Sequence, residues 1–567
     1  MKIEKENVKR YAVYTFHDKD GIVDECVLTF LKELKKVSEY LQVVVCEKIL
    51  SDDMGRLEAV ADKVVHQEDT GASGDRYTRN VEKALYSQFD EIIYCDDVFF
   101  GPLHSFETMF SAMKARDVDI WSPVLACAGQ FLVIRKCVFE NEDMLSRLAD
   151  IHQPGFNVAE TVKKQGFIFE SYVDESEFAG CTEDPLRDFP LYMVKDKKCP
   201  IVKRDIFKRK YDEVFEKSNG DAARKLMDYL RDSSGYDTAQ IWEHLLRTCN
   251  MADLKKTMQL NYVLSSRLPK ARKHTINKIA LTMHIYYEDQ AEMCRAYAES
   301  MPEGTDVFIT VPTEEKKKNA EKVFKDFPYK TEFRVIGNRG RDVGAFLTAV
   351  KDVVFDYDLV CKMHDKKVTQ VKPMSLGASW AYKCFENMLK NKTYVENIIA
   401  TFEEEPNLGM LHPPIPHHGP YYPIAGRGEW GPNYQPTKAL AEKIGIRADI
   451  REDKEPIAPL GAMFWFRPQA LKSIFACDWE YEDYPEEPIA DDATLLHAIE
   501  RLYPFCVQEQ GYYPAWVMAD TFARIELDNW EFLNHEFIKA EMDLLGSHLS
   551  FKELTGALAK QKPDQAK

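Results

Sequence analysis

Two stretches of sequence, FDEIIYCDD (Phe89–Asp97) and YDLVCKMHD (Tyr357–Asp365), indicate a repeated α/β fold. Each starts with an aromatic residue followed by Asp, continues as an apolar strand-like run and ends on Asp, and the two lie 268 residues apart. The same offset aligns YAVYTFH, from Tyr11, with IALTMHI, from Ile279. Any two α/β domains share such coarse periodicity, but the aligned aspartates at the strand ends favour an internal duplication.

Each copy alternates strand-like and helix-like segments. In the first copy, strand-like runs near Tyr11, Leu41, Lys63 and Glu91 alternate with helix-like windows around Val23, Asp53 and Thr78. Before the last of these strands the first copy has GASGD, ending at Asp75, and the second has NRGRD, ending at Asp342. Such alternation is typical of parallel sheets. The predicted fold class is therefore α/β, with two Rossmann-like domains.

A different pattern separates the two copies. From residue 203 to 270, runs such as AARKLMDYLRD and DTAQIWEHLLRT place apolar residues three and four positions apart, which indicates helices. The prediction is a first domain over residues 1–202, a helical connector over 203–270 and a second domain over 271–560. No Pro-rich or Ser-rich linker separates these parts.

Composition excludes several classes of protein. The 567 residues are 45% hydrophobic and 30% charged, which favours large cores over disorder. A net charge of −18 makes nucleic acid a poor partner. No apolar run reaches the length of a membrane-spanning helix, and MKIEKENVKR at the start does not resemble a signal peptide, so we expect a soluble, cytoplasmic protein. The 13 cysteines include no CxxC pair, which argues against a disulfide framework or a zinc ribbon.

Three polar clusters in the second copy follow strand-like runs, where open α/β sheets bind their ligands. Asn338, Arg341 and Asp342 combine a turn with arginine forks suited to phosphate, although a turn with solvated charges would look similar. The second cluster is His364, Asp365, Lys366 and Lys367. It can meet a diphosphate or a phosphate-bound metal, or it can be a charged strand end on the surface.

The third cluster is the acidic pair Asp491 and Asp492, placed before the apolar helix pattern LLHAIERL. Aspartate at a helix start is favoured for capping alone, which explains one carboxylate more readily than two. A general base is the functional interpretation of this pair. In the first copy Asp96 and Asp97 end a strand, but no matching acidic helix start follows, so we expect that copy to lack equal chemistry. His417 and His418 lie among prolines without the spacing of zinc ligands.

Several of these motifs together resemble the rhamnan synthesis protein F family of bacterial polysaccharide-building proteins. The run NRGRDVGAFL from Asn338, followed by YDLVCKMHDKK, carries the strongest match. GAMFWFRPQAL from Gly461 and TLLHAIERLYPFCVQEQGYYPAW from Thr494 are also similar to the family. The resemblance covers the chain roughly from Tyr11 to Trp516.

The resemblance implies two GT-A-type nucleotide-sugar domains and transfer of a sugar, rhamnose or a related deoxy-hexose, to a growing cell-surface polysaccharide. A more distant likeness to inverting family 2 glycosyltransferases implies that Asp491, or else Asp492, is the base. Asn338, Arg341 and Asp342 would then hold the nucleotide, and His364, Lys366 and Lys367 would face the diphosphate. Asp365 would act with Mg²⁺ or Mn²⁺, although this strand end reads His364-Asp365 rather than DxD.

The expected partners are a nucleoside-diphosphate sugar and a glycan or lipid-linked glycan acceptor, with peripheral contact at the inner face of the membrane. Two alternatives stay open. One is a scaffold that binds nucleotide sugars or glycans without catalysis. The other is a dinucleotide-dependent enzyme, which the absence of GxGxxG after the first strand disfavours.

Overall fold

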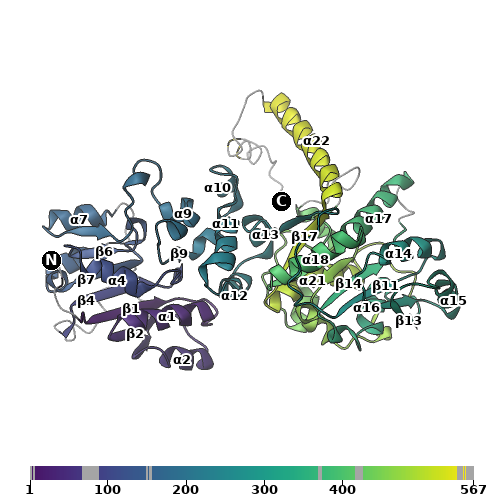
Figure 1. Cartoon of the computed structure of the whole chain (residues 1–567), viewed down its shortest axis with the longest axis horizontal. Helices are drawn as coiled ribbons and strands as arrows, with labels where there is room; N and C mark the ends of the chain where they lie inside the picture. The colour runs from purple at the N-terminus through teal and green to yellow at the C-terminus, as the bar shows by residue number, and fades with distance from the viewer. Residues whose placement is uncertain are drawn as a thin grey trace, which may run out of the picture. The chain divides into compact units, whose positions relative to one another are not determined.

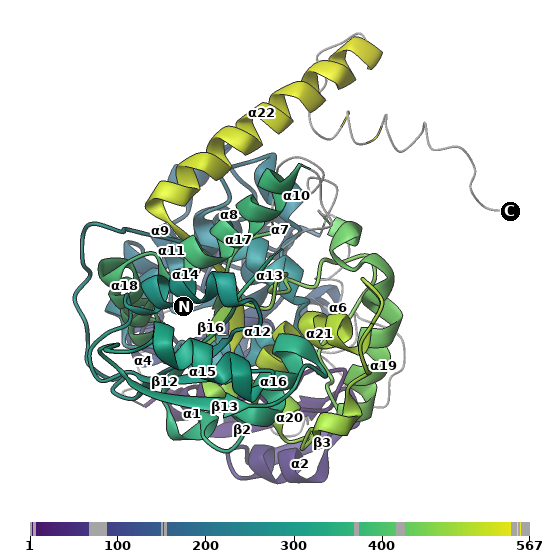
Figure 2. The same cartoon turned by 90° about the vertical axis from the view of Figure 1, so that its right-hand side faces the viewer.

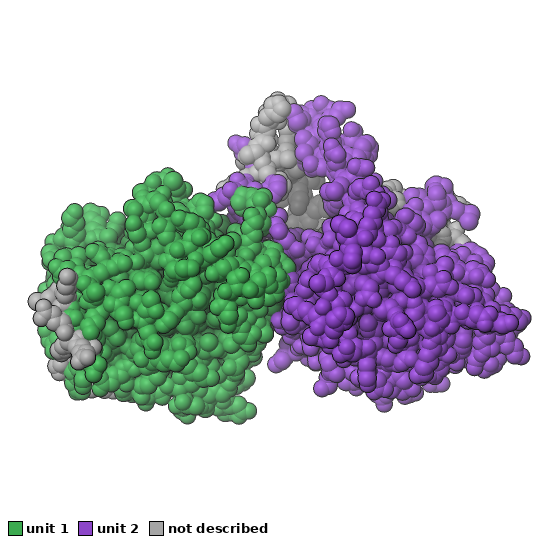
Figure 3. Space-filling model, in the orientation of Figure 1, with its two compact units in different colours: residues 1–210, 218–244 green, residues 211–217, 245–567 purple. Residues whose placement is uncertain are grey.

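The computed structural model describes residues 7–66, 88–148, 156–367, 373–415 and 426–545, with single positions at 3, 151, 553 and 556. GASGD, the predicted helix around Thr78, His417 and His418 lie outside the described residues. The chain divides into two compact units (Figure 3). Unit 1 comprises Met1–Lys210 and Ser218–His244, and unit 2 comprises Tyr211–Lys217 and Leu245–Lys567.

Unit 1 contains a seven-stranded sheet with the order β3-β2-β1-β4-β7-β6-β8. Its strands are β1 (Arg10–Phe16), β2 (Tyr40–Val45), β3 (Lys63–His66), β4 (Glu91–Asp96), β6 (Ile120–Ser122), β7 (Phe131–Arg135) and β8 (Phe169–Ser171). Only β7 runs antiparallel to its neighbours in this sheet. The four strands predicted in the first copy are all present. Because β1 and β4 are buried on both faces, their apolar runs are nearly continuous.

Among the described residues of unit 1, helices and one small ribbon accompany this sheet (Figure 1). The helices are α1 (Glu25–Val37), α2 (Ser51–Glu58), α4 (Phe106–Lys114), α5 (Lys136–Phe139), α6 (Glu142–Leu148), α7 (Val158–Lys164), α8 (Pro185–Asp188), α9 (Pro190–Lys195) and α11 (Ala222–Tyr229). The amphipathic α1 buries Phe30 against Phe106 of α4, with ring centroids 5.2 Å apart. The ribbon pairs β5 (Phe99–Phe100) with β9 (Val202–Lys203).

Unit 2 contains an eight-stranded sheet with the order β10-β17-β15-β16-β14-β11-β12-β13. Its strands are β10 (Asn261–Leu264), β11 (Ile279–His284), β12 (Asp306–Val311), β13 (Lys330–Val335), β14 (Leu359–His364), β15 (Leu408–His412), β16 (Phe464–Phe466) and β17 (Tyr513–Ala519). Only β16 is antiparallel to its neighbours.

The two sheets have one topology. Read as β13-β12-β11-β14-β16-β15-β17, the second sheet repeats the order and the strand directions of the first, and β10 is an addition at its edge. In both sheets the antiparallel strand lies directly beside the strand that ends on the quoted aspartate motif. The sequence repeat therefore corresponds to two sheets of the same design.

The helices of unit 2 cover this sheet in two groups. One group is α16 (Arg341–Ala349), α19 (Tyr434–Ile444), α20 (Lys472–Phe475) and α21 (Leu495–Glu509), which share a core rich in aromatic rings. The other is α14 (Ala291–Ala298), α17 (Met374–Leu389), α18 (Lys392–Glu404) and α22 (Asp520–Leu545). α15 (Glu314–Val323) packs on β12 and β13. Beyond Glu526, α22 projects from the rest of unit 2, and Leu527 and Phe532 on it are 68% and 66% exposed (Figure 2).

The connector predicted over residues 203–270 is not a unit of its own. α11 packs on α9 in unit 1, whereas α10 (Tyr211–Phe215) packs on α13 (Met251–Thr257) in unit 2. α12 (Ala239–Thr248) spans the boundary between the units. The amphipathic pattern predicted these helices but not the core that each would join, because a helix buries its apolar stripe wherever a complementary surface exists. None of the helices within the described residues has the combination of length and apolarity that crossing a membrane requires.

Candidate functional site

A pocket of about 480 Å³ opens at the carboxyl edge of the sheet in unit 2. Its walls come from the ends of β11 and β14, the first turn of α16, the segment before β16 and the segment that leads into α21. Eight of the nine residues predicted for the site line it: Asn338, Arg341, Asp342, His364, Asp365, Lys366, Lys367 and Asp491. Asp492 does not. Open α/β sheets bind their ligands beyond the carboxyl ends of the strands, and the position of the pocket follows this strand-end rule.

The turn from β13 into α16 depends on two glycines. Gly337 and Gly340 have φ values of +82° and +80°, which side chains adopt only with strain. A Cβ atom on Gly340 would lie 2.7 Å from the ring of Tyr484. Arg341 itself has φ +47°, an uncommon conformation for a residue with a side chain and one that clusters at functional sites. The turn therefore presents Arg341 and Asp342 to the pocket under backbone strain.

His364 and Asp342 form the inner wall of the pocket. Nε2 of His364 lies 2.7 Å from the carbonyl oxygen of Gly461, and Nδ1 lies 2.6 Å from that of Asp365. Nζ of Lys362 donates to Oδ2 of Asp342 over 2.8 Å. Burial works against the charge of Asp342, yet the neighbouring His364 and Lys362 hold the pKa of this carboxyl well below its usual value. Asp342 is therefore an ionised acceptor.

Asp365 is tied to the backbone that follows β11. Its Oδ2 accepts the N–H groups of Tyr286, over 2.8 Å, and of Tyr287. Burial raises the pKa of Asp365 to about 7 in spite of these bonds. A divalent cation prefers several oxygen ligands, whereas within the described residues Asp365 belongs to no group of three His, Cys, Asp or Glu side chains whose ligand atoms lie within 4.8 Å of one another. The residues around Asp365 therefore fit a metal ion poorly.

The cations of the pocket have partners within the chain. Arg341 makes a forked pair with Glu487, with Nε–Oε1 at 2.7 Å and Nη2–Oε2 at 3.2 Å. Nζ of Lys367 lies 2.5 Å from Oδ2 of Asp289. Nζ of Lys366 lies 4.6 Å from the ring centre of Trp380. Surface pairs of this kind contribute about 0–1 kcal/mol each, so an anionic ligand can replace them at small cost.

The two aspartates of the acidic pair have different surroundings. Oδ1 of Asp492 accepts hydrogen bonds from the Asn433 amide and the Ala493 backbone, both over 2.8 Å. Asp491 lines the pocket. Neither caps the helix, because α21 begins at Leu495 with Thr494 before it. The capping interpretation is therefore wrong, and Asp491 is the one whose carboxylate can meet a ligand in the pocket.

Sequence reasoning missed six polar or aromatic residues of the pocket: His284, Tyr286, Tyr287, Glu487, His497 and Glu500. The first three follow or end β11, so the strand-end rule applied to that strand would have found them. No local signal points to Glu500, whose Oε2 accepts the N–H of Gly461 over 2.9 Å. That contact joins α21 to the segment before β16 and depends on the tertiary fold.

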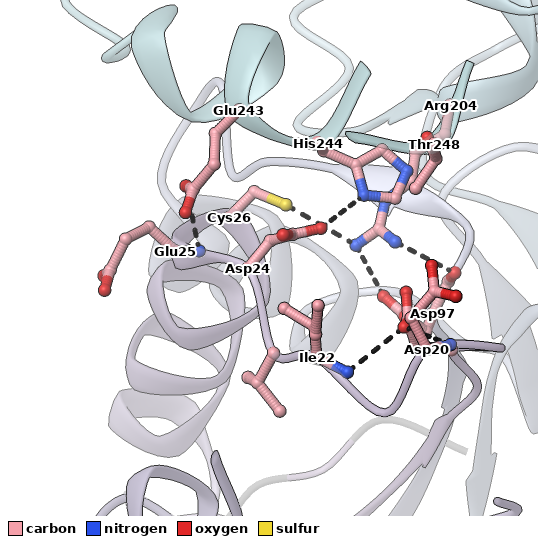
Figure 4. Close-up of polar contacts among 12 residues, drawn as sticks. Asp20, Ile22, Asp24, Glu25, Cys26, Asp97, Arg204, Glu243, His244 and Thr248 are labelled. Carbon is pink, nitrogen blue, oxygen red and sulfur yellow. Dashed lines mark hydrogen bonds and ion pairs between the residues drawn. The ribbon is translucent and has the colours of Figure 1, made fainter. Parts of the chain in front are cut away.

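At the corresponding edge of unit 1, buried polar side chains contact one another (Figure 4). Asp97, which the repeat aligns with Asp365, forms an ion pair of 2.5 Å with Arg204 and accepts the hydroxyl of Tyr14 over 2.7 Å. Both Asp97 and Arg204 are buried, with 2% and 8% of their side chains exposed. A guanidinium from the chain itself thus occupies the place next to this strand end.

Asp24, Cys26 and His244, beside Arg204 in unit 1, lie close enough together to suggest a metal site. Nδ1 of His244 lies 2.7 Å from Oδ2 of Asp24, and Nζ of Lys208 lies 2.8 Å from Nε2. Because the ammonium can only donate to Nε2, Nδ1 carries the proton and donates to Asp24. Burial lowers the pKa of His244 to about 4. The geometry is that of a closed hydrogen-bond network rather than a metal centre.

Comparison with known proteins places the chain in a family. A 235-residue stretch is 27% identical to uncharacterized protein WxcX of Xanthomonas campestris pv. campestris strain B100, and likewise to that of strain ATCC 33913. This stretch covers 41% of the chain and 32% of the relatives' own length.

Among solved structures, the glycosyltransferase GlyE of Streptococcus pneumoniae TIGR4 matches 66% of this chain and 90% of its own, with 11% identity and a TM-score of 0.23. Its apo form gives 12% identity and a TM-score of 0.25, covering 65% and 90%. Similarity at this level does not establish a shared fold or activity. The model of the family described as rhamnan synthesis protein F matches residues 42–125 and 140–512, which is most of the chain. The chain therefore belongs to the rhamnan synthesis protein F family.

Proposed function

We propose that the protein is a glycosyltransferase whose donor site is the pocket of unit 2. It would transfer a sugar, rhamnose or a related deoxy-hexose, from a nucleoside-diphosphate sugar to a growing cell-surface polysaccharide. The observation that supports this most is the combination, in one pocket, of Arg341, Lys366 and Lys367 with the carboxylate of Asp491. Cations suit a departing diphosphate, and a carboxylate suits a general base. Membership of a family described by polysaccharide synthesis agrees with this chemistry.

The proposed mechanism is a single displacement with inversion. Asp491 takes the proton of an acceptor hydroxyl as its oxygen bonds to the anomeric carbon of the donor sugar. The bond between that carbon and the diphosphate breaks, and the diphosphate leaves with both electrons. The charge that develops on it is stabilised by fixed cations. No covalent enzyme intermediate forms.

We assign the donor's parts to opposite ends of the pocket. Asn338, Arg341 and Asp342 would hold the nucleotide at the first turn of α16. His364, Lys366 and Lys367 would face the diphosphate at the end of β14. A phosphate of the donor would displace Glu487 from Arg341, since phosphate and carboxylate both accept bidentate hydrogen bonds from an arginine.

A divalent metal at Asp365 is not part of this proposal, because the contacts of that carboxylate fit an ion poorly. Mg²⁺ or Mn²⁺ that arrives with the diphosphate would neutralise charge in the manner of Lys366 and Lys367. Turnover in EDTA should then remain within about tenfold of turnover in Mn²⁺. A required ion stabilises the transition state by several kcal/mol, so its removal would lower turnover by far more than tenfold. Complete loss of turnover in EDTA would show that the reaction requires a metal ion, as the sequence-based expectation for Asp365 had it.

The experiment that tests the donor site is a thermal-shift panel with TDP, UDP, GDP and CMP, each with and without Mn²⁺. A ligand that binds the folded state raises its stability by mass action. A shift with one nucleotide supports a transferase and names its donor class. No shift with any of the four would contradict the donor site.

The alternative function is a binding scaffold without catalysis. One observation favours it. Arg341, Lys367 and His364 already form hydrogen bonds or ion pairs with other groups of the chain, as expected of a site that no longer carries out a reaction. Radiolabelled sugar transfer to a lipid-linked glycan, with vesicle flotation for peripheral membrane contact, separates the two. Binding of a sugar nucleotide with neither transfer nor hydrolysis would favour the scaffold.

We also propose that the two units arose by duplication and that unit 1 is a degenerate or acceptor-handling partner. The common sheet topology supports the duplication. The Arg204–Asp97 pair in unit 1 supports the loss of its donor site.

A further inference from the structure

Lys362 is a buried cation next to the candidate pocket. It lies in the middle of β14, two residues before His364, and is 1% exposed. The rings of Phe346 and Phe464 flank its ammonium, with their centres 5.4 and 5.7 Å from Nζ. A lysine is almost never fully buried unless a partner compensates its charge.

The ammonium of Lys362 joins two walls of the pocket. It donates to Oδ2 of Asp342 over 2.8 Å and to the carbonyl oxygen of Ala462 over 2.6 Å. Asp342 belongs to the first turn of α16, and Ala462 precedes β16 in a left-handed conformation with φ +52°. One side chain from the central strand therefore holds the helix start and a strained turn in place.

The contact also determines which oxygen of Asp342 faces a ligand. Asp342 lines the pocket, and 18% of its side chain is exposed. Oδ2 is bound to Lys362, whereas Oδ1 makes no hydrogen bond to the residues that the structure describes. An ionised carboxylate only accepts hydrogen bonds, so it repels a phosphate and can accept a hydrogen bond from a hydroxyl.

We propose that Lys362 is a positioning residue, which holds Asp342 as a fixed acceptor for a hydroxyl of the sugar nucleotide. The inference rests on the proposed function and adds to it a residue that does not touch the donor. It also orients the donor, because a hydroxyl then faces Asp342 and the phosphates face Arg341, Lys366 and Lys367. The hydroxyl can belong to the ribose or to the transferred sugar, and the experiment separates these sources.

A double-mutant cycle tests the proposal. The affinity for the sugar nucleotide whose nucleoside diphosphate wild type binds in the thermal panel is measured by calorimetry for wild type, K362M, D342N and the double variant. Hydrogen bonds to charged groups contribute about 1.5–3 kcal/mol, so K362M and D342N should each weaken binding about ten- to a hundredfold. The double variant should bind no more weakly than D342N alone, because Lys362 acts through Asp342.

The control is K383M, because Lys383 is also 1% exposed in unit 2 and does not line the pocket. It should bind the nucleotide as wild type does. K362Q is a second variant, whose amide can still donate to both oxygens without the charge. If K362M and K362Q both fail to fold while D342N/K362M folds, the rescue itself shows that Lys362 serves Asp342, because no unpaired carboxylate is left buried.

Further ligands identify the hydroxyl. Deoxy-ribose forms of the nucleotide and deoxy forms of the donor sugar should each be compared in wild type and D342N. The hydroxyl whose loss weakens binding in wild type but not in D342N is the one that meets Asp342. If no such hydroxyl exists, if K362M binds normally, or if the two substitutions are additive, the positioning role is wrong while the donor site stands. If wild type binds no nucleotide, the proposed function itself fails.

Discussion

At the scale of single residues, Asp491 and Asp492 are neighbours with different surroundings. Asp492 is engaged by Asn433 and by the Ala493 backbone, whereas Asp491 lines the pocket. Asp491→Asn should therefore lower turnover by about 10² or more and leave nucleotide affinity nearly unchanged. Asp492→Asn is the matched control and should retain most of the turnover. Steady-state transfer rates decide between them, and equal losses in both variants would contradict the assignment of the base.

Asp365 makes the stability of unit 2 depend on pH. Its pKa is about 7 in the folded chain, against about 3.9 for an ordinary aspartate. Between these values the folded state binds a proton that the unfolded state releases, so this group lowers stability as pH rises from about 4 to 7. Asp365→Asn removes the effect. The calorimetric melting temperature of Asp365→Asn should rise relative to that of wild type as pH increases from about 4 to 7. A difference between the two melting temperatures that stays constant over this range would contradict the raised pKa.

At the scale of elements, the turn before α16 and the loop 479–488 support each other. The ring of Tyr484 lies against Gly340 and Gly344, and Nε of Arg339 donates to the carbonyl oxygen of Tyr484 over 2.6 Å. Glu487, at the end of this loop, meets Arg341. The loop therefore positions the arginine that we assign to the nucleotide.

Gly340→Ala tests this support, with Gly445→Ala as its control. Both glycines have positive φ, +80° and +77°, but a Cβ atom on Gly445 would meet nothing within 4 Å. The left-handed conformation costs about 1–2 kcal/mol in either variant. Overlap with Tyr484 should add about 1–3 kcal/mol in Gly340→Ala alone and weaken nucleotide binding. Chemical denaturation and calorimetry measure the two effects, and equal results for both variants would show that the loop does not press on the turn.

At the scale of the whole molecule, the chain has two sheets of one topology but different strand ends. In unit 2 the edge carries a pocket, and in unit 1 Arg204 and Asp97 fill the corresponding place. Nucleotide should therefore slow hydrogen exchange around residues 338–342 and 364–367 and leave residues 91–97 and 204–207 unchanged. Calorimetry should give one nucleotide per chain. Protection in unit 1, or a second binding event that Asp97→Asn abolishes, would show that unit 1 also binds nucleotide.

Local patterns in the amino-acid sequence predicted many of the strands and helices and the repeat. Apolar runs at a fixed offset predicted the strands that became β1, β4, β11 and β14, because a strand buried on both faces must be apolar throughout. The same logic placed Asn338, Asp342 and His364 at one edge, since the carboxyl ends of parallel strands meet there. The signals for these features are local, so no knowledge of packing was needed.

The contacts of each polar side chain depend on the tertiary structure. It separated Asp491 from Asp492, brought Glu487 and Glu500 from distant segments, and gave Asp342 a buried lysine. It also divided the predicted connector between two units. A hydrogen bond acts over about 3 Å, and which groups come that close depends on how whole elements pack, which the periodicity of one segment does not encode.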